Sequence, residues 1–490
     1  MSYSSRRTKQ KSTKSFDFLT GINSIFLLIF SLVGGLFIFN ILKYNFLNVR
    51  FINVIIIASL ILFFVVSLFL IVKKRAKVLT LIMLLLLSIA SGIGLYLTHS
   101  AINISNHLNE TASYSEIEMS VVVPKDSEIT DVSQLDNVLA PLDNDRSNID
   151  ALMNDIKTQK NKTIAVETTD SYDAAYEALI AGEKSAMVMS SAYDSLLEVK
   201  HENYSDNLKT IYTYKVVKQI EKPDSSVTNT DSFNIYISGI DTYGSISSVS
   251  RSDVNIIMTV NRKTNKVLLT TTPRDAYVQI PDGGNNQYDK LTHAGIYGVE
   301  ASIHTLENLY DIKIDYYARI NFTSFLKLID LLGGIEVEND QAFTSHIGGL
   351  DFPVGKLQMN SEMAFAFVRE RYSLENGDKD RGRNQTKVIA AIIDKLTSVN
   401  AITNYTNIIN GLGDSIQTNM PLETMMGLAN DQLSTGDRYS VLSQSVDGVG
   451  STGELPSYAM PSASLYMLSL DENNLENAKL AIKETMEGTR

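Results

Sequence analysis

Three long apolar runs without a charged residue occupy most of the first hundred positions of the chain. They cover residues 18–42, 51–72 and 78–97, and each is long enough to cross ~30 Å of hydrocarbon as an α-helix. A cleaved signal peptide has a shorter apolar core and a small-residue cleavage site, which the first run lacks. The sequence therefore predicts three transmembrane helices within 18–97, preceded by a short tail at 1–17.

Basic residues flank these runs unevenly. Five lie before the first run and four lie at 73–77, between the second and third runs, whereas the loop 43–50 contains two. Because cytoplasmic loops carry an excess of Lys and Arg, we expect the tail and the second loop in the cytoplasm and everything after Leu97 outside the cell. This arrangement predicts a multi-pass protein of the cell membrane. Its cytoplasmic parts are too short for a folded DNA-binding domain.

The rest of the chain is strongly acidic. Residues 98–490 contain 54 Asp and Glu against 32 Lys and Arg. Binding to nucleic acid draws its affinity from neutralised phosphates, so this balance argues against a nucleic-acid partner. The chain also has no cysteine, which excludes disulfides, thiolate catalysis and Cys-ligated metal sites.

Two α/β regions follow the apolar runs. In the first, at 110–222, predicted strands at 119–124 and 185–189 flank a predicted helix at 172–182. Its order is similar to a lobe of a periplasmic solute-binding protein, but it shows no ligand constellation, which favours a spacer or docking module. A polar linker at 221–231 separates it from the second region.

The second region, at 230–490, also alternates strands and helices. Period-two runs predict strands at 233–239, 254–260 and 266–272, and a helix closed by glycine is predicted at 321–334. A later helix carries one apolar stripe, formed by Val388, Ile392, Leu396 and Val399. Strands interleaved with helices predict a layered α/β domain in which helices cover both faces of a sheet.

Arginine is concentrated in this acidic second region. Eight of the 15 arginines lie between 251 and 383, namely Arg251, Arg262, Arg274, Arg319, Arg369, Arg371, Arg381 and Arg383. Several of them fall where predicted strands end, and strand ends of open α/β sheets face the ligand crevice. Guanidinium groups bind phosphate oxygens through two parallel hydrogen bonds. The pattern indicates a phosphate site, although any single arginine could instead pair with a neighbouring acid on the surface.

Two aspartates flank the same expected crevice. Asp241 follows the first predicted strand and Asp253 precedes the second. Paired carboxylates beside a phosphate ligand commonly hold Mg²⁺, and the alternative is that either acid caps a turn. The polar stretch 372–383 is expected to lead into a helix near Gln385, where basic groups would favour an anion. The P-loop, nucleophile-elbow and His-Glu-x-x-His templates are absent.

At these positions the chain resembles the LytR-CpsA-Psr family, most closely its streptococcal capsule members. The motifs that carry the resemblance are Gly239-Ile-Asp241, Ser250-Arg-Ser-Asp253, Thr272-Pro-Arg-Asp275, Lys290-Leu-Thr-His-Ala294, Asp315-Tyr-Tyr317, Asp330-Leu-Leu-Gly-Gly334, Phe367-Val-Arg-Glu-Arg371 and Asp378-Lys-Asp-Arg-Gly-Arg-Asn-Gln385. The three spans and the extra region at 110–222 also resemble those members. The resemblance implies an α-β-α domain with a central mixed sheet, in a Gram-positive bacterium.

The resemblance implies an extracellular phosphotransferase. Such proteins take a glycan polymer, capsular polysaccharide in the capsule members, from a polyprenyl pyrophosphate carrier in the membrane and join it to peptidoglycan through a phosphodiester. Hydrolysis of the pyrophosphate is a side reaction of the same site, and capsule assembly proteins are further expected partners. The alternative is a regulator or sensor of capsule assembly that binds the same lipid without transferring the polymer.

The resemblance also assigns roles to individual residues. Asp241 and Asp253 match the family's Mg²⁺ ligands, and the pyrophosphate head contacts are matched by Arg251, Arg274, Arg369, Arg371, Arg381 and Gln385. The prenyl tail is expected in an apolar tunnel between the sheet and the helices. Thr292 departs from the family's usual Asn, and Thr271-Thr272 departs from Ile-Pro.

The transfer reaction itself needs two kinds of group. Arg274 is expected to neutralise charge on the transferred phosphoryl group. A carboxylate must help to deprotonate the acceptor hydroxyl, and Asp275 and Asp378 are the candidates.

Overall fold

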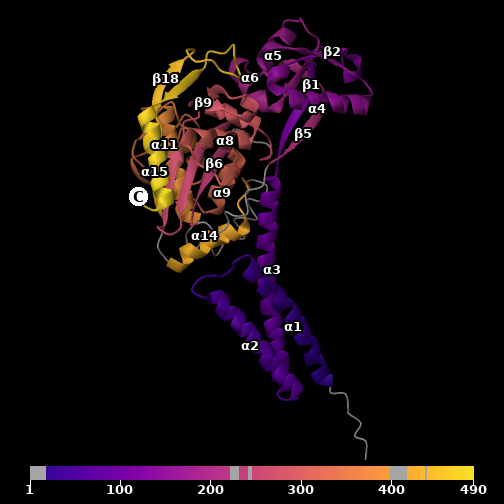
Figure 1. Ribbon diagram of the computed structural model, residues 1–490, viewed down its shortest axis with the longest axis vertical. Coiled ribbons are helices and arrows are strands. Elements are labelled where there is room, and N and C mark those ends of the chain that lie inside the picture. The colour runs from indigo at the N-terminus through magenta and orange to yellow at the C-terminus, as the bar shows by residue number, and fades with distance from the viewer. Residues whose placement is uncertain (1–17, 221–230, 241–245, 397–415, 436–438) are drawn as a thin grey trace, which may run out of the picture. The chain divides into compact units, whose positions relative to one another are not determined.

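The computed structural model describes residues 18–220, 231–240, 246–396, 416–435 and 439–490 (Figure 1). The chain divides into an N-terminal unit, residues 1–103, and a C-terminal unit, residues 104–490. The two units are considered separately below.

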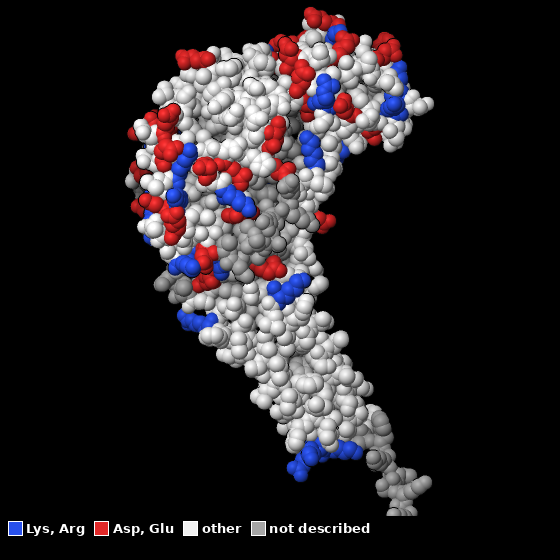
Figure 2. Space-filling model, in the orientation of Figure 1, with Lys and Arg blue, Asp and Glu red and all other residues white. Residues whose placement is uncertain are grey.

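The N-terminal unit contains three helices that are long and apolar enough to cross a membrane. They are α1 (Phe18–Lys43), α2 (Ile52–Val72) and α3 (Lys77–Thr111), which confirms the three helices predicted from the apolar runs. On the face shown in Figure 2, charged side chains lie only at the ends of this unit and its sides are uncharged. Helix α3 continues 14 residues past the third apolar run, which ends at Leu97.

Polar side chains inside the N-terminal unit find partners on neighbouring helices. Asn23 Nδ2 donates to the carbonyl oxygen of Lys77 at 2.9 Å, and Asn40 Nδ2 donates to Thr98 Oγ1 at 3.1 Å. Such pairs are needed because an unpaired polar group in hydrocarbon costs several kcal/mol. They hold α1 against α3.

The first part of the C-terminal unit is a five-stranded sheet, here called the accessory sheet. Its strand order is β3-β2-β4-β1-β5, with β1 antiparallel to β4 and β5, and β2 parallel to β3 and β4. The elements are β1 (Tyr114–Pro124), β2 (Asn137–Ala140), α4 (Leu142–Lys160), β3 (Ala165–Thr168), α5 (Tyr172–Ile180), β4 (Met187–Ser190), α6 (Asp194–Lys200) and β5 (Leu208–Gln219).

Local signals explain why α5 forms where the sequence predicts it. Ser171 Oγ accepts a hydrogen bond from the amide of Ala174 at 3.1 Å and caps the helix. Gly182 follows the helix with φ +76°, a conformation that favours glycine.

The core of the accessory sheet is not made by residues 110–222 alone. It also contains Val249, Ile296, Ala459 and Met460, which are buried and come from the second α/β region. The two regions therefore share one hydrophobic core, and the accessory sheet packs directly on the region that follows it.

The second region is built on a six-stranded mixed sheet, the central sheet, with order β16-β11-β6-β7-β8-β17. The pairs β11/β6 and β8/β17 are parallel and the others are antiparallel, which confirms the predicted α/β fold. Its strands are β6 (Ser232–Ile240), β7 (Ser252–Asn261), β8 (Lys266–Thr271), β11 (Tyr316–Ile320), β16 (Ile416–Thr418) and β17 (Ser440–Ser445).

Helices cover both faces of the central sheet. Alternate strand residues separate into two cores because successive side chains point to opposite faces. Tyr236 and Leu268 pack with α8 (Val299–Tyr310) and α15 (Glu472–Glu487). Ile235 and Leu269 face the other side, toward α11 (Asp378–Leu396) and α14 (Leu422–Thr435).

Shorter elements complete the C-terminal unit. Helix α9 (Phe322–Leu331) is capped by Asn321, whose Oδ1 accepts from the amide of Ser324, and it ends before Gly333 and Gly334, at φ +69° and +85°. The remaining elements are β9 (Tyr277–Ile280), β10 (Gln287–Lys290), α7 (Leu291–Ala294), β12 (Ile335–Asn339), β13 (Phe343–Thr344), β14 (Asp351–Phe352), β15 (Gly355–Met359), α10 (Ser361–Arg369), β18 (Gly448–Thr452) and β19 (Tyr466–Leu470).

Candidate active site

The end of β6 and the start of β7 meet at one edge of the central sheet. Ile240 pairs with Ser252 across a register shift, so Asp253 lies at that edge. A side chain at Gly239 would bring its Cβ within 2.7 Å of Val254 Cγ2, which explains the glycine. Asp241, the other aspartate expected here, lies outside the described residues.

A polar cavity of about 290 Å³ opens at this edge. It brings together side chains from β7, from the segment after β8, from the end of α10 and from α11. Among its lining residues are six of the residues predicted from the sequence, namely Asp253, Arg274, Arg369, Arg371, Arg381 and Gln385. The lining carries four arginines against two carboxylates, Asp253 and Glu370, and such an excess of guanidinium groups suits an anion with several oxygens.

Asp253 is held in its charged form by its neighbours. Arg274 Nη1 donates to Asp253 Oδ1 at 2.9 Å, and Thr292 Oγ1 donates to the same oxygen at 3.2 Å. Burial alone would raise the pKa of Asp253, but the charges of Arg274, Arg251 and Arg381 outweigh burial and the pKa is lowered. Thr292 thus supplies a donor at the position where the sequence departs from the family's usual Asn.

The other predicted residues lie beside this cavity or beyond what can be described. Arg251 acts on Asp253 through its charge but is not among the lining residues. Asp275 lies behind Arg274: its Oδ1 accepts from Lys290 Nζ at 2.8 Å, and its Oδ2 is 3.9 Å from Arg274 Nε. The side chain of Asp378 lies outside the described part of the chain, so both candidate bases stay predictions.

Helix α11 begins earlier than the sequence predicts. The stretch up to Gln385 was expected to precede a helix, but the helix starts at Asp378, so Arg381 and Gln385 lie on its first two turns. The reason is a local contact at the helix start: the carboxylate of Asp380 accepts hydrogen bonds from the backbone amide and the side-chain amide of Asn376, four residues earlier.

Glu370 is a site residue for which no role was predicted from the sequence. It is buried, and its carboxylate accepts hydrogen bonds from the backbone amides of His346, Arg371 and Ser373. Burial acts to raise the pKa of Glu370, but these amides outweigh it and the pKa is lowered. Glu370 fixes the segment that carries Arg371, whose Nη2 donates to Tyr372 Oη at 2.7 Å. The sequence signal that could have identified Glu370 is its position between Arg369 and Arg371.

An apolar cavity of about 380 Å³ adjoins the polar one. It lies between the central sheet and helices α9, α10, α11 and α14, and most of its lining side chains are apolar. Gly239, Val254, Val368 and Gln385 line both cavities, so the two spaces meet at these residues. This is the place in which the resemblance implies a prenyl tunnel.

Besides Arg251, three further arginines of the cluster do not line the polar cavity. Arg262 Nε lies 2.6 Å from Asp431, and Arg383 Nη1 lies 2.7 Å from Asp380; these are the ion pairs that the sequence left open as an alternative. Arg319 is buried beside the apolar cavity, where it donates to Gln417 and to the carbonyl oxygen of Ser248.

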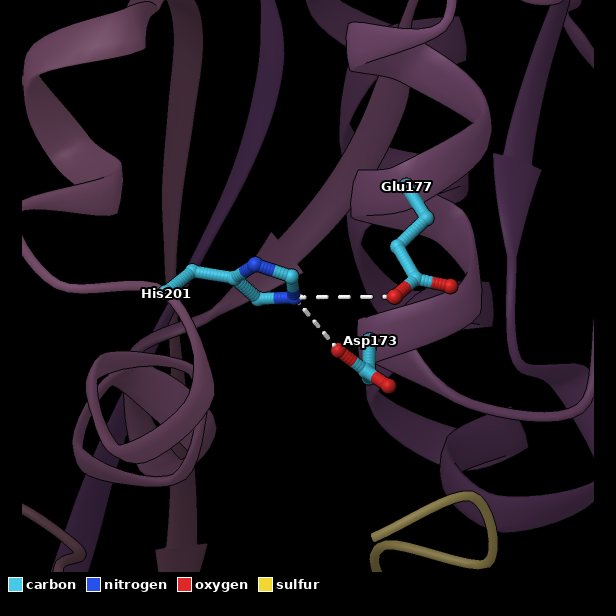
Figure 3. Close-up of side chains that lie close together, drawn as sticks. All are labelled: Asp173, Glu177 and His201. Carbon is cyan, nitrogen blue, oxygen red and sulfur yellow. Dashed lines mark hydrogen bonds and ion pairs between the residues drawn. The ribbon is translucent and has the colours of Figure 1, made fainter.

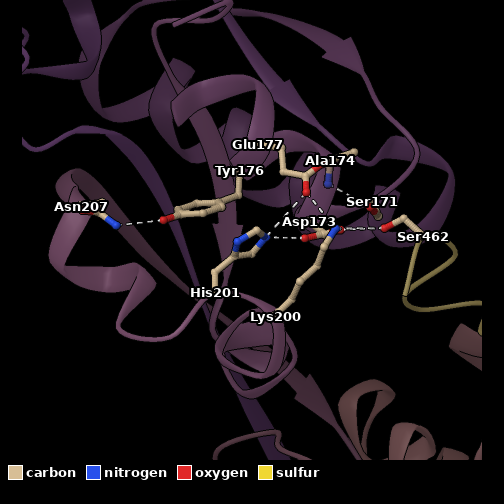
Figure 4. Close-up of polar contacts among 9 residues, drawn as sticks. All are labelled: Ser171, Asp173, Ala174, Tyr176, Glu177, Lys200, His201, Asn207 and Ser462. Atoms are coloured by element: carbon tan, nitrogen blue, oxygen red, sulfur yellow. Dashed lines mark hydrogen bonds and ion pairs between the residues drawn. The ribbon is translucent and has the colours of Figure 1, made fainter. Parts of the chain in front are cut away.

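Among the described residues, one group of three side chains could hold a metal ion: Asp173, Glu177 and His201 (Figure 3). A cation is already present there, because Lys200 Nζ lies 2.6 Å from Asp173 and 2.8 Å from Glu177. Ser462 Oγ also donates to Asp173, at 2.7 Å (Figure 4). This group is an ion-pair network that ties the accessory sheet to the segment between β18 and β19.

We expect Gly295→Ala to weaken binding at the polar cavity although residue 295 does not line it. An added Cβ would lie 2.6 Å from the carbonyl oxygen of Ser250 and 2.7 Å from the amide of Ser252, so the backbone that carries Asp253 must move. Pyrophosphate affinity should fall by about tenfold, or ~1.4 kcal/mol, measured by calorimetry. Gly92→Ala, whose Cβ meets no atom within 4 Å, is the control, and equal affinities in both variants would contradict this reasoning.

Comparison with known proteins places the polar cavity in a family context. The sequence model of the LytR_cpsA_psr family matches residues 187–479. A second model, DNA polymerase processivity factor, matches residues 74–189, less than a quarter of the chain and partly within apolar helix α3.

Curated relatives match about half of this chain. TagU of Enterococcus faecalis, a polyisoprenyl-teichoic acid–peptidoglycan teichoic acid transferase, is 36% identical over 222 residues, 45% of this chain and 72% of TagU. TagT of Bacillus subtilis is 31% identical over 280 residues, 55% of this chain and 81% of TagT.

Two solved structures are similar to part of this chain. A Streptococcus agalactiae protein covers 55% of this chain and 92% of its own at 25% identity, with a TM-score of 0.47. TagT bound to LI-WTA covers 55% and 94% at 28% identity, with a TM-score of 0.43. The family match alone spans more than half of the chain and includes every residue that lines the polar cavity. The chain therefore belongs to the LytR-CpsA-Psr family.

Proposed function

We propose that this chain is a membrane-anchored phosphotransferase that moves capsular polysaccharide from a polyprenyl pyrophosphate carrier to peptidoglycan. The observation that carries the proposal is the junction of the two cavities: four arginines line a space that shares wall residues with a mostly apolar one. A polyprenyl pyrophosphate has the same two parts, an anionic head and an apolar tail. The three apolar helices would tether the C-terminal unit, outside the cell, to the bilayer in which such a lipid is confined.

The reaction is a phosphoryl transfer. The oxygen of an acceptor hydroxyl on peptidoglycan attacks the phosphorus that bears the glycan, and the bond from that phosphorus to the bridging oxygen breaks. The products are a glycan–peptidoglycan phosphodiester and a polyprenyl monophosphate. Arg274, Arg369, Arg371 and Arg381 would neutralise the phosphate oxygens, which is most of what such a transfer requires. The hydroxyl proton passes to a carboxylate, with Asp275 and Asp378 as the candidates.

The donor set at Asp253 fits a magnesium ion. Among the described residues, both hydrogen bonds to Asp253 end on Oδ1, which leaves Oδ2 for a cation, and Mg²⁺ takes carboxylate and phosphate oxygens as ligands. Asp253, together with Asp241, would hold the ion, and the ion would supply further charge neutralisation to the pyrophosphate. The lowered pKa of Asp253 keeps the carboxylate ionised for this role.

The choice of capsular polysaccharide rests on the part of the chain that the curated relatives do not match. TagU and TagT carry teichoic acid in their names and cover about half of this chain. The three apolar helices and strands β1, β2 and β3 of the accessory sheet lie before residue 187, where the family match begins, and the capsule members that the sequence resembles carry similar additions. Teichoic acid as the preferred donor would therefore correct the polymer and leave the reaction class unchanged.

Transfer by the purified chain tests the proposal. Full-length protein in detergent is given lipid-linked capsular polysaccharide and peptidoglycan, and polymer bound to the insoluble wall fraction is measured. We expect attachment with Mg²⁺, and loss of at least 90% of it after chelation or in Asp253→Asn, because phosphate charge is then less neutralised. Gln358→Ala, an exposed polar residue on β15, is the matched control. Tight lipid binding without attachment of any polymer would instead support the regulator.

A further inference from the structure

A second polar cavity lies where the accessory sheet meets the second α/β region. This junction cavity has a volume of about 300 Å³. Its walls come from the start of α4, from β1, β4 and β5, and from the two segments at 282–285 and 296–297 that flank β10 and α7. None of its lining residues lines the polar or the apolar cavity of the active site.

Deep polar atoms in this cavity lack partners. Asn148 and Ser190 are 5% and 0% exposed, yet among the described residues Asn148 Oδ1 and Ser190 Oγ have no hydrogen-bond partner of ordinary geometry. Ser190 is nevertheless close enough to Tyr172 to act against the rise that burial causes in the pKa of that phenol. The hydroxyls of Tyr193 and Tyr297 lie close enough to influence each other, but neither makes a hydrogen bond of ordinary geometry. Since buried polar atoms are almost always paired, several unpaired ones in one small cavity point to a missing ligand.

Asp145 adds a carboxylate to the same wall. Helix α4 is kinked at this residue, and the carboxylate accepts from Tyr172 Oη at 2.7 Å and from Asn148 Nδ2 at 2.5 Å. Burial raises the pKa of Asp145 to about 6, although Tyr172, Lys218 and Asn148 act against it. Asp145 is partly exposed as a residue and lines the cavity.

The lining excludes other classes of ligand. Asp143, Asp145 and Asp282 outnumber Arg146 and Lys218, which disfavours a phosphate or another anion. The described residues of this cavity include no group of three close metal ligands. The polar groups of the lining are amides, hydroxyls, carboxylates and two phenol rings. Together these groups can both donate and accept hydrogen bonds.

We propose that the junction cavity is a saccharide-binding site that holds one or two sugar units of a glycan, apart from the pyrophosphate site. A pyranose ring carries several hydroxyls that donate and accept, and its C–H face can pack on Tyr193 or Tyr297. The volume is at the lower end for small-molecule sites, which suits a short piece of a chain. The choice of a glycan rests on the proposed function, because both of its substrates are glycans.

Two glycans could supply these sugar units, the polymer being transferred or the peptidoglycan that accepts it. Two probes separate them. One is the peptidoglycan disaccharide N-acetylglucosaminyl-N-acetylmuramic acid, and the other is a lipid-free oligosaccharide released from the capsule. Each is titrated against the full chain in detergent, with binding read by saturation-transfer NMR and calorimetry. We expect one of the two to bind.

Two variants tie that binding to the junction cavity. Asp145→Asn keeps an acceptor for Tyr172 but removes the charge, and it should weaken binding roughly tenfold, as for loss of a charged hydrogen bond. Gly283→Ala places a Cβ 2.5 Å from the ring of Tyr297, so the ring must move, and binding should weaken by at least as much. Asp150→Asn, an exposed carboxylate on the same helix that is not part of the lining, is the matched control.

Inorganic pyrophosphate serves as a separate probe of the active site. Its affinity should be the same in the parent chain and in all three variants, and that result also verifies that the variants are folded. The inference is overturned if neither saccharide binds the parent chain. It is also overturned if Asp145→Asn and Gly283→Ala bind the saccharide as tightly as Asp150→Asn does. Failure of pyrophosphate to bind the parent chain would instead count against the proposed function.

Discussion

Replacing Arg274 with alanine should lower the rate of polymer transfer by ~100- to 1,000-fold, the usual cost of removing one preorganised donor from a developing negative charge. Arg274 is 17% exposed and its Nη1 lies 2.9 Å from Asp253 Oδ1. Its loss removes a contact to the phosphoryl oxygens and also leaves a carboxylate facing the substrate without its strongest positive neighbour. Transfer is measured at saturating lipid-linked polymer, so that weaker binding does not mask the rate.

Two further variants make this test specific. Arg274→Lys keeps the charge but loses the planar fork, and it should fall between the parent and Arg274→Ala. Arg383→Ala removes an exposed arginine of α11 that pairs with Asp380, and it should transfer at the parent rate. An Arg274→Ala protein that is folded and keeps half of the activity would remove this residue from the mechanism.

Filling the apolar cavity should abolish the preference for long lipids. Ala318, on β11, is a small side chain on the wall of that cavity, and Ala318→Phe would occupy space otherwise open to a prenyl chain. Burial contributes ~0.8 kcal/mol per CH₂, so affinity for polyprenyl phosphates should rise steeply with length in the parent and stay flat in the variant. For a long chain we expect at least ~100-fold weaker binding.

The comparison of lipid lengths makes this second test internally controlled. A short prenyl phosphate should bind Ala318→Phe nearly as well as the parent, because the arginines of the polar cavity are untouched. Met425→Trp, on α14 at the opposite wall, should behave like Ala318→Phe. Val449→Phe, exposed on β18, should change nothing. Equal dependence on length in all four proteins would show that the tail binds elsewhere.

Much of the fold could be predicted because its signals are local. The alternating residues of β6 and β7, the Ser171 cap of α5 and the glycines at 333 and 334 each act within a few residues of where they stand. The apolar runs were equally direct, since membrane-spanning length is a property of the sequence itself. Such features need no knowledge of what packs against them.

The candidate site also has features that could be predicted from the sequence and features that could not. The arginine motifs could be read from the sequence, but the burial of Asp275 against Lys290 could not, because the contact joins two different elements. The early start of α11 depends on a local contact, from Asp380 to Asn376, and belongs with the features that a sequence can show. The role of Glu370 depends in addition on the distant amide of His346, which a sequence does not show. The junction cavity was invisible for the same reason, since its walls come from several distant segments.

The shared core of the accessory sheet has a consequence for how this protein can be dissected. Val249, Ile296, Ala459 and Met460 are buried among side chains of residues 117–216, so a fragment that begins at residue 231 would turn those four side chains toward water. An isolated accessory fragment would lose these four side chains from its own hydrophobic core. Truncation experiments that assume separable modules would then report aggregation rather than function, and point substitutions are the sounder way to assign a task to each half.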